Sequence, residues 1–410
     1  MNQNSGGICA QISFVSEESV PNAIALLEEK PDLLILVSST KMRGSRPYNQ
    51  LRDFALSRGT EVVTFGDEAK GTDLLDLGAL ADEVAKYISG RRDITSVSIN
   101  LTGGPKTMTI VFMEFAKSLK DLKSMWLYID TDERVIWRSK PSHFSPNRSL
   151  MQGYLSFEEY LYVQGYEVMR KHPESYGDVV KNREKLTFHL AEVARDSASQ
   201  KGHSRSILQE LLTLFTKARV SDRGIAYKDQ YLSNVDQRSV KVLEMLTDFG
   251  LLGLEKVANH ENQYRITFQD VPSARYIGGA WLEEFAWLQL SKAAQGCKLD
   301  SNTVISSAVV VKPREGSEDS SNEIDVLCLN RNKMLFVECK SGAKPDKEGG
   351  VATSKLADLT RKVGGRLATS ILVASAPRQE IPSGRSTAVK VFAAEDLFEL
   401  ERYFTKWLTS

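Results

Sequence analysis

The first third of the chain alternates short β-rich runs with amphipathic helical patterns. Between residues 8 and 130, helical stretches separate β-rich runs such as ICAQISFV, LLILVS, EVVTF and SVSINL, with short connections. This β-α-β-α order predicts an open parallel sheet with helices on both faces, because parallel neighbours need a crossover connection. Residues 1–153 are therefore expected to form a Rossmann-like α/β domain.

The rest of the chain changes character twice. Residues 154–275 carry helical patterns and one strand-like run, QYRITF, after a polar turn. That order predicts a winged-helix-like domain, with a plain helical linker as the alternative. Residues 276–410 return to mixed strands and helices and predict a third, α/β domain. A chain of 410 residues is long enough for three such domains.

Composition excludes several classes of protein. The 53 basic residues balance the 53 acidic residues, so no overall positive field attracts the chain to nucleic acid. No apolar run approaches about 18 residues, and the N-terminus lacks the basic start of a signal peptide. The four cysteines form no CxxC pair and are expected to be reduced and buried. We expect a soluble, cytoplasmic protein without a membrane partner.

Two strand-like runs in the third domain flank a polar Asn-Arg-Asn-Lys turn and predict a β-hairpin. If Leu329 faces Met334 across the turn, then Asp325 lies opposite Glu338. Alternation along the strands places Lys340 on the same face as these two carboxylates. The opposite face is then apolar, formed by Ile324, Val326, Leu335 and Val337.

Paired carboxylates on neighbouring strands repel each other unless a cation or a proton lies between them. A divalent metal is the simplest explanation, and the preceding helix offers Glu283 or Glu284 as a third oxygen ligand. Residues 276–410 contain no histidine and no cluster of cysteines, so the site favours Mg²⁺ or Mn²⁺ over zinc. The alternative is a surface hairpin with cross-strand charges, because Glu-x-Lys is a common pattern.

The pattern Asp-x12-Glu-x-Lys resembles the PD-(D/E)xK restriction-endonuclease-like superfamily, although the usual proline before the aspartate is absent. Metal-dependent hydrolysis of phosphodiester bonds is the activity that this resemblance implies. It also implies that Asp325 and Glu338 hold the metal with the carbonyl of Cys339. Lys340 would orient or activate the attacking water, and Glu283 is favoured as the helix carboxylate.

A run of basic residues follows the hairpin. It predicts a strip that faces the phosphates of a substrate, with a solvated helix face as the alternative. Its members are Lys340, Lys344, Lys347, Lys355, Arg361, Lys362 and Arg366.

The loops after the strands of the first domain are the expected ligand site, because open parallel sheets bind ligands at the carboxyl ends of their strands. Hydroxyls, cations and paired glycines that expose backbone N–H groups predict a phosphate-bearing ligand there. The sequence GGPKT lacks the spacing of an ordinary nucleoside triphosphate loop. Alternatively, the glycines serve only a tight turn. The candidate residues are Ser39, Thr40, Lys41, Asn100, Thr102, Gly103, Gly104, Lys106 and Thr107.

Residues 100–106, Asn-Leu-Thr-Gly-Gly-Pro-Lys, resemble the Asn-x-Thr-Gly-Gly-x-Lys motif of the CARF domain. A CARF domain followed by a winged-helix-like segment and a PD-(D/E)xK domain resembles the CRISPR ancillary nucleases of type III systems. The resemblance implies a homodimer that binds a cyclic oligoadenylate messenger, usually cyclic tetra-adenylate, and then degrades DNA or RNA. Two-fold symmetry fits such a ring, because two copies of the loops can contact it identically.

Two rival functions use the same residues differently. In the first, the middle domain binds DNA under control of a cyclic nucleotide and the third domain is inert, as in a transcription regulator. In the second, a restriction-type enzyme cuts without any messenger. The sequence leaves open the choice between DNA and RNA, the ring size, and the choice between Glu283 and Glu284.

Overall fold

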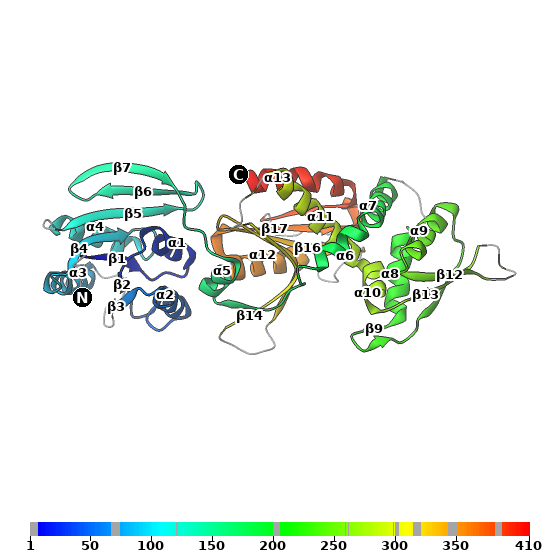
Figure 1. Cartoon of the computed structure of the whole chain (residues 1–410), viewed down its shortest axis with the longest axis horizontal. Helices are drawn as coiled ribbons and strands as arrows, with labels where there is room; N and C mark the ends of the chain where they lie inside the picture. Colours follow the sequence, from blue (N-terminus) through cyan, green and yellow to red (C-terminus); the bar gives the residue numbers. More distant parts are fainter. Residues whose placement is uncertain are drawn as a thin grey trace, which may run out of the picture.

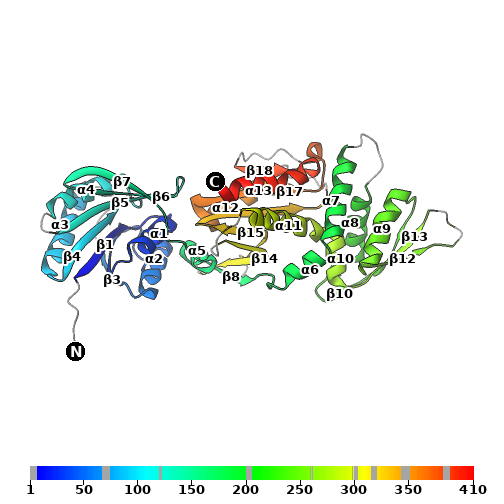
Figure 2. The ribbon, with the colours of Figure 1, turned by 45° about the horizontal axis from the view of Figure 1, so that its top comes forward.

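The computed structural model describes residues 7–66, 74–119, 122–199, 206–258, 260, 262–297, 299, 303–314, 321–342, 351–381 and 388–410. Three regions follow one another along the long axis of the molecule (Figure 1). The N-terminal domain lies at one end, and the C-terminal domain lies in the centre. The middle of the chain forms the other end, as the second view also shows (Figure 2).

The N-terminal domain is built on a seven-stranded sheet with the order β3-β2-β1-β4-β5-β6-β7. Its first five strands are parallel and its last two are antiparallel, which confirms the Rossmann-like prediction. Helices α1 and α2 pack on one face, and α3 and α4 pack on the other. The strands are β1 (Ile8–Phe14), β2 (Leu33–Val37), β3 (Glu61–Phe65), β4 (Ile94–Asn100), β5 (Lys123–Asp130), β6 (Val135–Lys140) and β7 (His143–Leu150). The helices are α1 (Val20–Glu29), α2 (Arg46–Ser57), α3 (Leu74–Gly90) and α4 (Lys106–Ser118).

Strand β7 has little strand signal in the sequence. Its residues are exposed along almost the whole strand, so it has little of the alternating burial that marks a strand in a sequence. Pairing with β6 holds it in place instead. An edge strand of this kind depends on its neighbour rather than on its own pattern.

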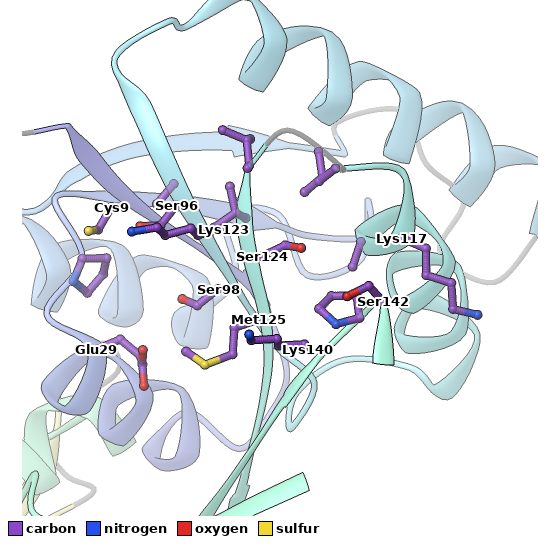
Figure 3. A pocket seen from close by; sticks show the side chains of 17 residues that line it. Cys9, Glu29, Ser96, Ser98, Lys117, Lys123, Ser124, Met125, Lys140 and Ser142 are labelled. Atoms are coloured by element: carbon purple, nitrogen blue, oxygen red, sulfur yellow. The ribbon is translucent and has the colours of Figure 1, made fainter. Parts of the chain in front are cut away.

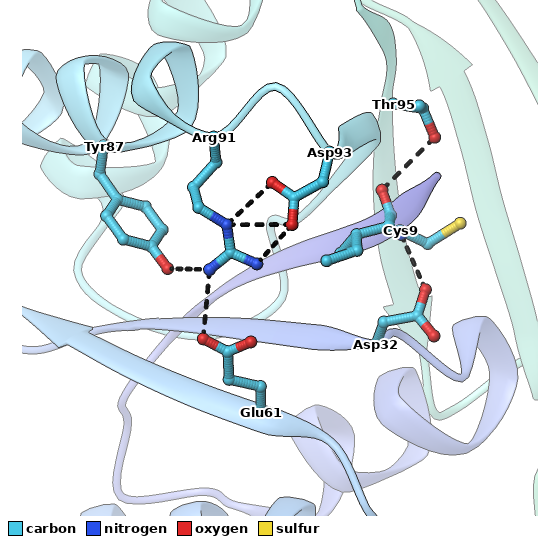
Figure 4. A network of polar contacts seen from close by, with 8 residues as sticks. Cys9, Asp32, Glu61, Tyr87, Arg91, Asp93 and Thr95 are labelled. Carbon is cyan, nitrogen blue, oxygen red and sulfur yellow. Dashed lines mark hydrogen bonds and ion pairs between the residues drawn. The ribbon is translucent and has the colours of Figure 1, made fainter. Parts of the chain in front are cut away.

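A polar network fastens the edge of this sheet at which the parallel strands begin (Figure 4). Arg91, after α3, donates to Asp93 at 2.8 Å, to Glu61 of β3 at 3.2 Å and to the hydroxyl of Tyr87 at 3.1 Å. These contacts join α3 to β3 and to the turn before β4. They stabilise the edge opposite the predicted ligand loops.

The middle domain contains two helices and a three-stranded antiparallel sheet with the order β11-β13-β12. The sequence of helix, strand, helix and β-hairpin agrees with the predicted winged-helix-like segment, although only the last strand was expected. The helices are α8 (Ile207–Ala218) and α9 (Gln237–Asp248). The strands of the sheet are β11 (Asp229–Leu232), β12 (Leu252–Lys256) and β13 (Tyr264–Phe268), and a small ladder joins β9 (Val220–Ser221) to β10 (Gly224–Ile225). Helix α7 (Glu184–Ser199) joins this domain to the C-terminal one.

The C-terminal domain is built on a mixed six-stranded sheet with the order β18-β17-β16-β15-β14-β8. Helices α11 and α13 pack on one face, and α12 and α5 pack on the other. The strands are β14 (Val304–Pro313), β15 (Asn322–Asn330), β16 (Lys333–Lys340), β17 (Ala368–Ala374), β18 (Val389–Phe392) and β8 (Tyr166–Arg170). The helices are α5 (Phe157–Gln164), α6 (Tyr176–Asn182), α11 (Trp281–Gly296), α12 (Val351–Gly364) and α13 (Leu400–Thr409), with shorter turns at Tyr276–Ala280, Gly365–Leu367, Arg378–Glu380 and Ala394–Glu399. The short helix α10 (Val271–Arg275) packs on β9 and β13 of the middle domain.

Strand β8 alters the expected boundaries between the domains. It comes before the middle domain in the sequence, yet it pairs with β14 and completes the sheet of the C-terminal domain. The segment from α5 to α6 therefore belongs structurally with residues 276–410. In the sequence, YEVMR resembles the end of a helical stretch, and only the distant partner strand makes it extended.

Two further expectations concern membranes and cysteines. Among the described helices, none is long and apolar enough to cross a bilayer. All four cysteines are free, as expected. Cys328 and Cys339 are buried, but Cys9 is exposed, because β1 begins at the open edge of its sheet.

Candidate functional site

The predicted hairpin is present with the predicted register. Leu329 pairs with Met334, and the antiparallel ladder runs on to Val326 and Val337. Arg331 and Asn332 form the two-residue turn, both with positive φ, as tight hairpin turns require. The alternation of apolar residues and the polar turn therefore suffice to place this pair of strands.

The ladder between β15 and β16 stops at Asp325, the first candidate carboxylate. Asp325 does not continue the pairing toward Glu338; its carboxylate accepts a hydrogen bond from the backbone N–H of Cys339 at 2.6 Å. On the other side, the ladder with β14 skips Ala308, whose φ is +47°. Positive φ is unusual for a residue with a Cβ, so Asp325 lies at a local kink of the sheet.

This kink reverses the faces of β15. Val326 packs under α11 together with Leu335 and Val337, as predicted. Ile324 packs in the core on the other side of the sheet, with Leu327. The expectation that Ile324 and Val326 share a face is therefore wrong. Strict alternation fails because Ala308 interrupts the neighbouring strand at this point.

Glu338 and Lys340 lie at the end of β16, next to this kink. The Lys340 ammonium donates to the Glu338 carboxylate at 2.5 Å, and the Glu338 side chain is 21 % exposed. Burial lowers the pKa of Lys340, but Glu338 and Asp325 outweigh that effect and raise it. Lys340 is therefore a fixed positive charge beside the carboxylates.

The two candidate glutamates of α11 have different surroundings. Glu284 is 2 % exposed and accepts hydrogen bonds from Arg183 Nε at 2.8 Å and from the Tyr176 hydroxyl at 2.7 Å. Its charge is thus already paired. The carboxylate of Glu283, in contrast, is affected by the charges of the hairpin. Burial raises the pKa of Glu283 to about 8, and the negative charge of Asp325 is the next largest cause of the rise.

The carboxylates around the kink repel one another. Burial raises the pKa of Asp325 to about 7, and the charge of Glu338 adds to the rise against the opposing hydrogen bond from Cys339. Among the described residues, no three His, Cys, Asp or Glu side chains are arranged as a finished metal-binding group. The donors are nevertheless all oxygens, and their crowding fits a hard divalent cation that would compete with Lys340 for Glu338.

The basic strip begins at Lys340 beside Glu338, but its far end at Arg366 lies away from these carboxylates. Arg361 and Lys362 both form ion pairs with Asp358, at 2.9 and 2.6 Å. Ala368, two residues after Arg366, pairs with Met334 at the start of β16, whereas Glu338 lies near its end. At about 3.3 Å per residue, roughly 13 Å of strand separates the two positions. Lys344 and Lys347 lie outside the described residues.

At the other candidate site, the glycine loop between β4 and α4 is held by buried amides. Asn100 is fully buried; its side chain donates to the Asn22 side chain at 2.8 Å and accepts from the Thr102 backbone at 3.0 Å. The Thr102 hydroxyl accepts from the Ile129 backbone at 2.7 Å. These two residues shape the loop, a structural role that the sequence analysis assigned to the glycines alone.

The paired glycines have steric reasons. A Cβ on Gly103 would lie 2.6 Å from the Phe14 carbonyl oxygen, and one on Gly104, whose φ is +77°, would lie 2.6 Å from the Phe14 Cβ. The turn therefore packs directly on the end of β1. Backbone N–H groups come close to the sheet edge in this way without a side chain covering them.

The remaining loop residues differ in their exposure. Thr40, Lys41 and Lys106 are exposed, and Ser39 is partly buried. The Thr107 hydroxyl is buried and has no hydrogen-bond partner among the described residues. The predicted set thus divides into residues that build the loop and residues that lie around it.

The N-terminal and C-terminal domains meet beside the glycine loop at a contact here called the seam. Glu18, in the loop after β1, accepts a hydrogen bond from the Arg366 backbone at 3.4 Å. The buried Tyr160 hydroxyl donates to the Gly364 carbonyl at 2.6 Å. A polar cavity of about 120 Å³ lies here, lined by residues of both domains that include Ser16, Glu18, Thr102, Tyr160 and Arg366.

A second cavity, of about 1030 Å³, opens at the edge of the N-terminal sheet where its strands begin (Figure 3). Lys117, Lys123 and Lys140 line it together with several serines. No motif marks this groove in the sequence, since its lysines come from three separate elements. It lies at the opposite edge of the sheet from the glycine loop.

Comparisons with known protein families agree with the division into two sites. Residues 10–160 match the model of the Card1 CARF domain, and residues 270–410 match the Card1-like endonuclease domain. No curated protein matches the chain in sequence.

Solved structures share the whole fold at low identity. Protein VC1899 from Vibrio cholerae is 18 % identical, with 98 % of each chain covered and a TM-score of 0.77. Can2 from Sulfobacillus thermosulfidooxidans, solved with cyclic tetra-adenylate, is 15 % identical, with 99 % of this chain and 98 % of that chain covered and a TM-score of 0.72. A type III CRISPR defence DNA nuclease activated by cyclic oligoadenylate is 18 % identical, with 96 % and 51 % covered and a TM-score of 0.52.

The two family matches lie in the predicted order, and together they span more than two thirds of the chain. Each contains one of the two sites described above. The chain therefore consists of a domain of the Card1 CARF family, followed after the middle domain by a domain of the Card1-like endonuclease family.

Proposed function

We propose that this protein is a metal-dependent nuclease of type III CRISPR defence, activated by a cyclic oligoadenylate, most simply cyclic tetra-adenylate. The observation that carries the proposal is the crowding of Asp325, Glu283 and Glu338 beside Lys340 inside the endonuclease domain. Clusters of buried carboxylates are rare outside functional sites, because burial makes their repulsion costly.

In the proposed cleavage reaction, residues of this chain would bind the metal ion and orient the attacking water. Asp325, Glu338 and the carbonyl of Cys339 would hold Mg²⁺ or Mn²⁺, with Glu283 as a further carboxylate. When bound, such a cation neutralises a phosphate and makes water a better nucleophile. Lys340 is placed beside Glu338, where its charge can orient the attacking water and stabilise the developing negative charge.

For the messenger, the exposed loop residues supply the contacts and the buried ones the shape. Lys41 and Lys106 would bind phosphates, aided by Ser39, Thr40 and Thr107, while Asn100, Thr102, Gly103 and Gly104 keep the backbone N–H groups at the sheet edge. The cyclic tetra-adenylate bound by Can2 supports this ligand class. A ring of identical units suits a homodimer, whose two-fold axis repeats the same loops.

Activation requires that the ring bind one arrangement of the domains more tightly than another. The seam supports this idea, because Thr102 borders both the glycine loop and the cavity that Arg366 lines. A shift in the loops would therefore be transmitted to the C-terminal end of α12. From there the chain continues through a short turn into β17, which pairs with β16. We expect cleavage with little preference for base sequence, since no described feature near the carboxylates is a base-reading element.

A cleavage assay tests the proposal. Separate plasmid, single-stranded DNA and RNA substrates are incubated with Mn²⁺, Mg²⁺ or EDTA, each with no ring, cyclic tetra-adenylate or cyclic hexa-adenylate. Cleavage that needs both a divalent cation and a ring supports it. Full activity without a ring would indicate the restriction-type enzyme, and ring-dependent DNA binding without cuts would indicate the transcription regulator.

A further inference from the structure

The segment between the CARF domain and the middle domain packs against α11 and β14 of the nuclease domain, although it lies outside both family matches. Residues 166–184 form β8, a turn, α6 and the start of α7; we call them the connector. Strand β8 joins the sheet through β14, with Val168 paired to Val311. The connector is therefore part of the nuclease structure and more than a link between domains.

Its strongest contact is with the residue beside Glu283. Arg183 and Tyr176 hold the carboxylate of Glu284 from two sides, with the guanidinium donating through both Nε and a terminal nitrogen. The Arg183 side chain is 15 % exposed and also lies over the ring of Tyr276, 4.2 Å from its centre. Because Glu284 is fixed in this way, the first turn of α11 has little freedom to rotate, and Glu283 shares that turn.

A second contact reaches the kink opposite Asp325. The backbone N–H of His172 donates to the Ser307 carbonyl at 3.1 Å, and its ring lies 3.1 Å from the Ser307 hydroxyl. Ser307 precedes Ala308, the residue that the ladder skips. The His172 ring also stacks on Tyr176, with the ring centres 3.8 Å apart. One chain of contacts thus runs from the kink through His172 and Tyr176 to Glu284.

We propose that Arg183 and Tyr176 are positioning residues of the nuclease, which hold Glu283 toward Asp325 through Glu284 and so set the affinity for the divalent cation. This inference rests on the proposed function. Groups that orient metal ligands without touching the metal typically contribute 10- to 100-fold in metal affinity. Here they come from the connector, so the cutting site depends on a segment that precedes the middle domain.

A nearby ion pair provides a matched control. Lys292 of α11 pairs with Glu184 of α7 at 2.7 Å, with both side chains more than a third exposed. It therefore joins α11 to the residue next to Arg183, but about two turns away from Glu283 along the helix. Loss of this pair removes a link between the same helices without touching Glu284.

The experiment titrates Mn²⁺ into full-length wild type, Arg183→Gln, Tyr176→Phe and Lys292→Met by calorimetry without nucleic acid, and repeats the titration as cleavage rates with saturating cyclic tetra-adenylate. We expect Arg183→Gln to raise the Mn²⁺ midpoint by about 10-fold or more and Tyr176→Phe by about 3-fold. Lys292→Met should stay within about twofold of wild type. High Mn²⁺ should restore most of the rate, and Arg183→Lys should recover part of the affinity.

Each result decides something. Unchanged midpoints in both connector variants, or an equal rise in Lys292→Met, would overturn the inference. If Arg183→Gln fails to fold by circular dichroism, Tyr176→Phe decides alone, because it removes one oxygen atom. If wild type neither binds Mn²⁺ nor cuts, the proposed function itself fails, which is distinct from the failure of this inference.

Discussion

The two sites of this protein handle buried polar groups in opposite ways. In the glycine loop of the CARF domain, Asn100, Asn22 and Thr102 satisfy one another and the neighbouring backbone, so these three side chains need no ligand. At the nuclease kink, Asp325 and Glu283 are pushed toward their neutral forms by burial and by neighbouring carboxylates. The proposed messenger site is thus shaped largely by its own residues, whereas the proposed cation site is electrostatically incomplete without a cation.

The sharpest test of this contrast is Asp325→Asn, which keeps the shape and the acceptor for the Cys339 N–H but removes the charge. We expect cleavage to fall by about a thousandfold, because a group that binds the reacting centre is lost. Stability without metal should rise, since repulsion is relieved, and each kcal/mol gained raises the melting temperature by about 2–4 °C.

Cleavage assays and thermal melts in EDTA measure the two effects, and messenger binding serves as the control. An Asp325→Asn protein that cuts like wild type would remove the residue from the site. An Asp325→Asn protein that is inactive and less stable would mean that the aspartate is mainly structural.

The two glutamates of α11 should separate chemistry from folding. Glu283→Gln is expected to lower cleavage by about a hundredfold with little loss of stability, because its carboxylate is repelled in the metal-free protein. Glu284→Gln should instead destabilise the protein by about 3–5 kcal/mol, because it leaves the buried Arg183 guanidinium without its counter-ion. Denaturant unfolding and cleavage rates of both variants test this prediction. If Glu284→Gln instead loses cleavage and Glu283→Gln loses stability, then Glu284 is the carboxylate that faces the metal.

Substitutions in the glycine loop of the CARF domain should have two kinds of effect, depending on whether the residue contacts the messenger or maintains the shape of the loop. Lys106→Ala should raise the messenger concentration for half-maximal activation by about 10- to 150-fold. This range corresponds to the loss of about 1.5–3 kcal/mol, the usual contribution of a hydrogen bond to a charged group. Saturating ring should restore its rate. Asn100→Ala should not recover, because the loop loses its internal partners. Activation curves with cyclic tetra-adenylate measure both, and full recovery of Asn100→Ala would show that the loop keeps its shape without the amide.

The smallest effect is expected from Arg361→Ala with Lys362→Ala. Both side chains are paired with Asp358 on the exposed surface of α12. Replacing them should change the substrate concentration for half-maximal cleavage by less than about twofold, as is typical of exposed ion pairs. Cleavage at several salt concentrations provides the measurement. A much flatter salt dependence would revive the strip as a phosphate contact.

Local patterns in the sequence were enough for much of this structure. Alternation and a polar turn predict the hairpin register from Leu329 to Val326, and the glycine motif predicts the loop before α4. The missing parts depend on distant partners. Ala308 has no sequence feature that predicts positive φ, and only the neighbouring strand shows that Asp325 lies at a kink.

The connector illustrates the same limit at a larger scale. YEVMR becomes a strand because β14 offers it an edge, and no local signal identifies Arg183 as the partner of Glu284. Arg366 seemed part of a basic run from its spacing alone, yet its backbone contacts Glu18 of the CARF domain. Pairings between residues more than a hundred positions apart are decided by the tertiary fold, which single-sequence patterns do not describe.

Strand β8 pairs with β14, which is synthesised much later, and this delay sets the order in which the domains can fold on the ribosome. His172 and Ser307 are 135 residues apart, and a ribosome adding 5–20 residues per second needs roughly 7 to 27 seconds to cover that distance. All strands of the CARF sheet precede β8, so that domain can fold during this interval while β8 waits for β14. The proposed cutting site is therefore assembled after the CARF domain.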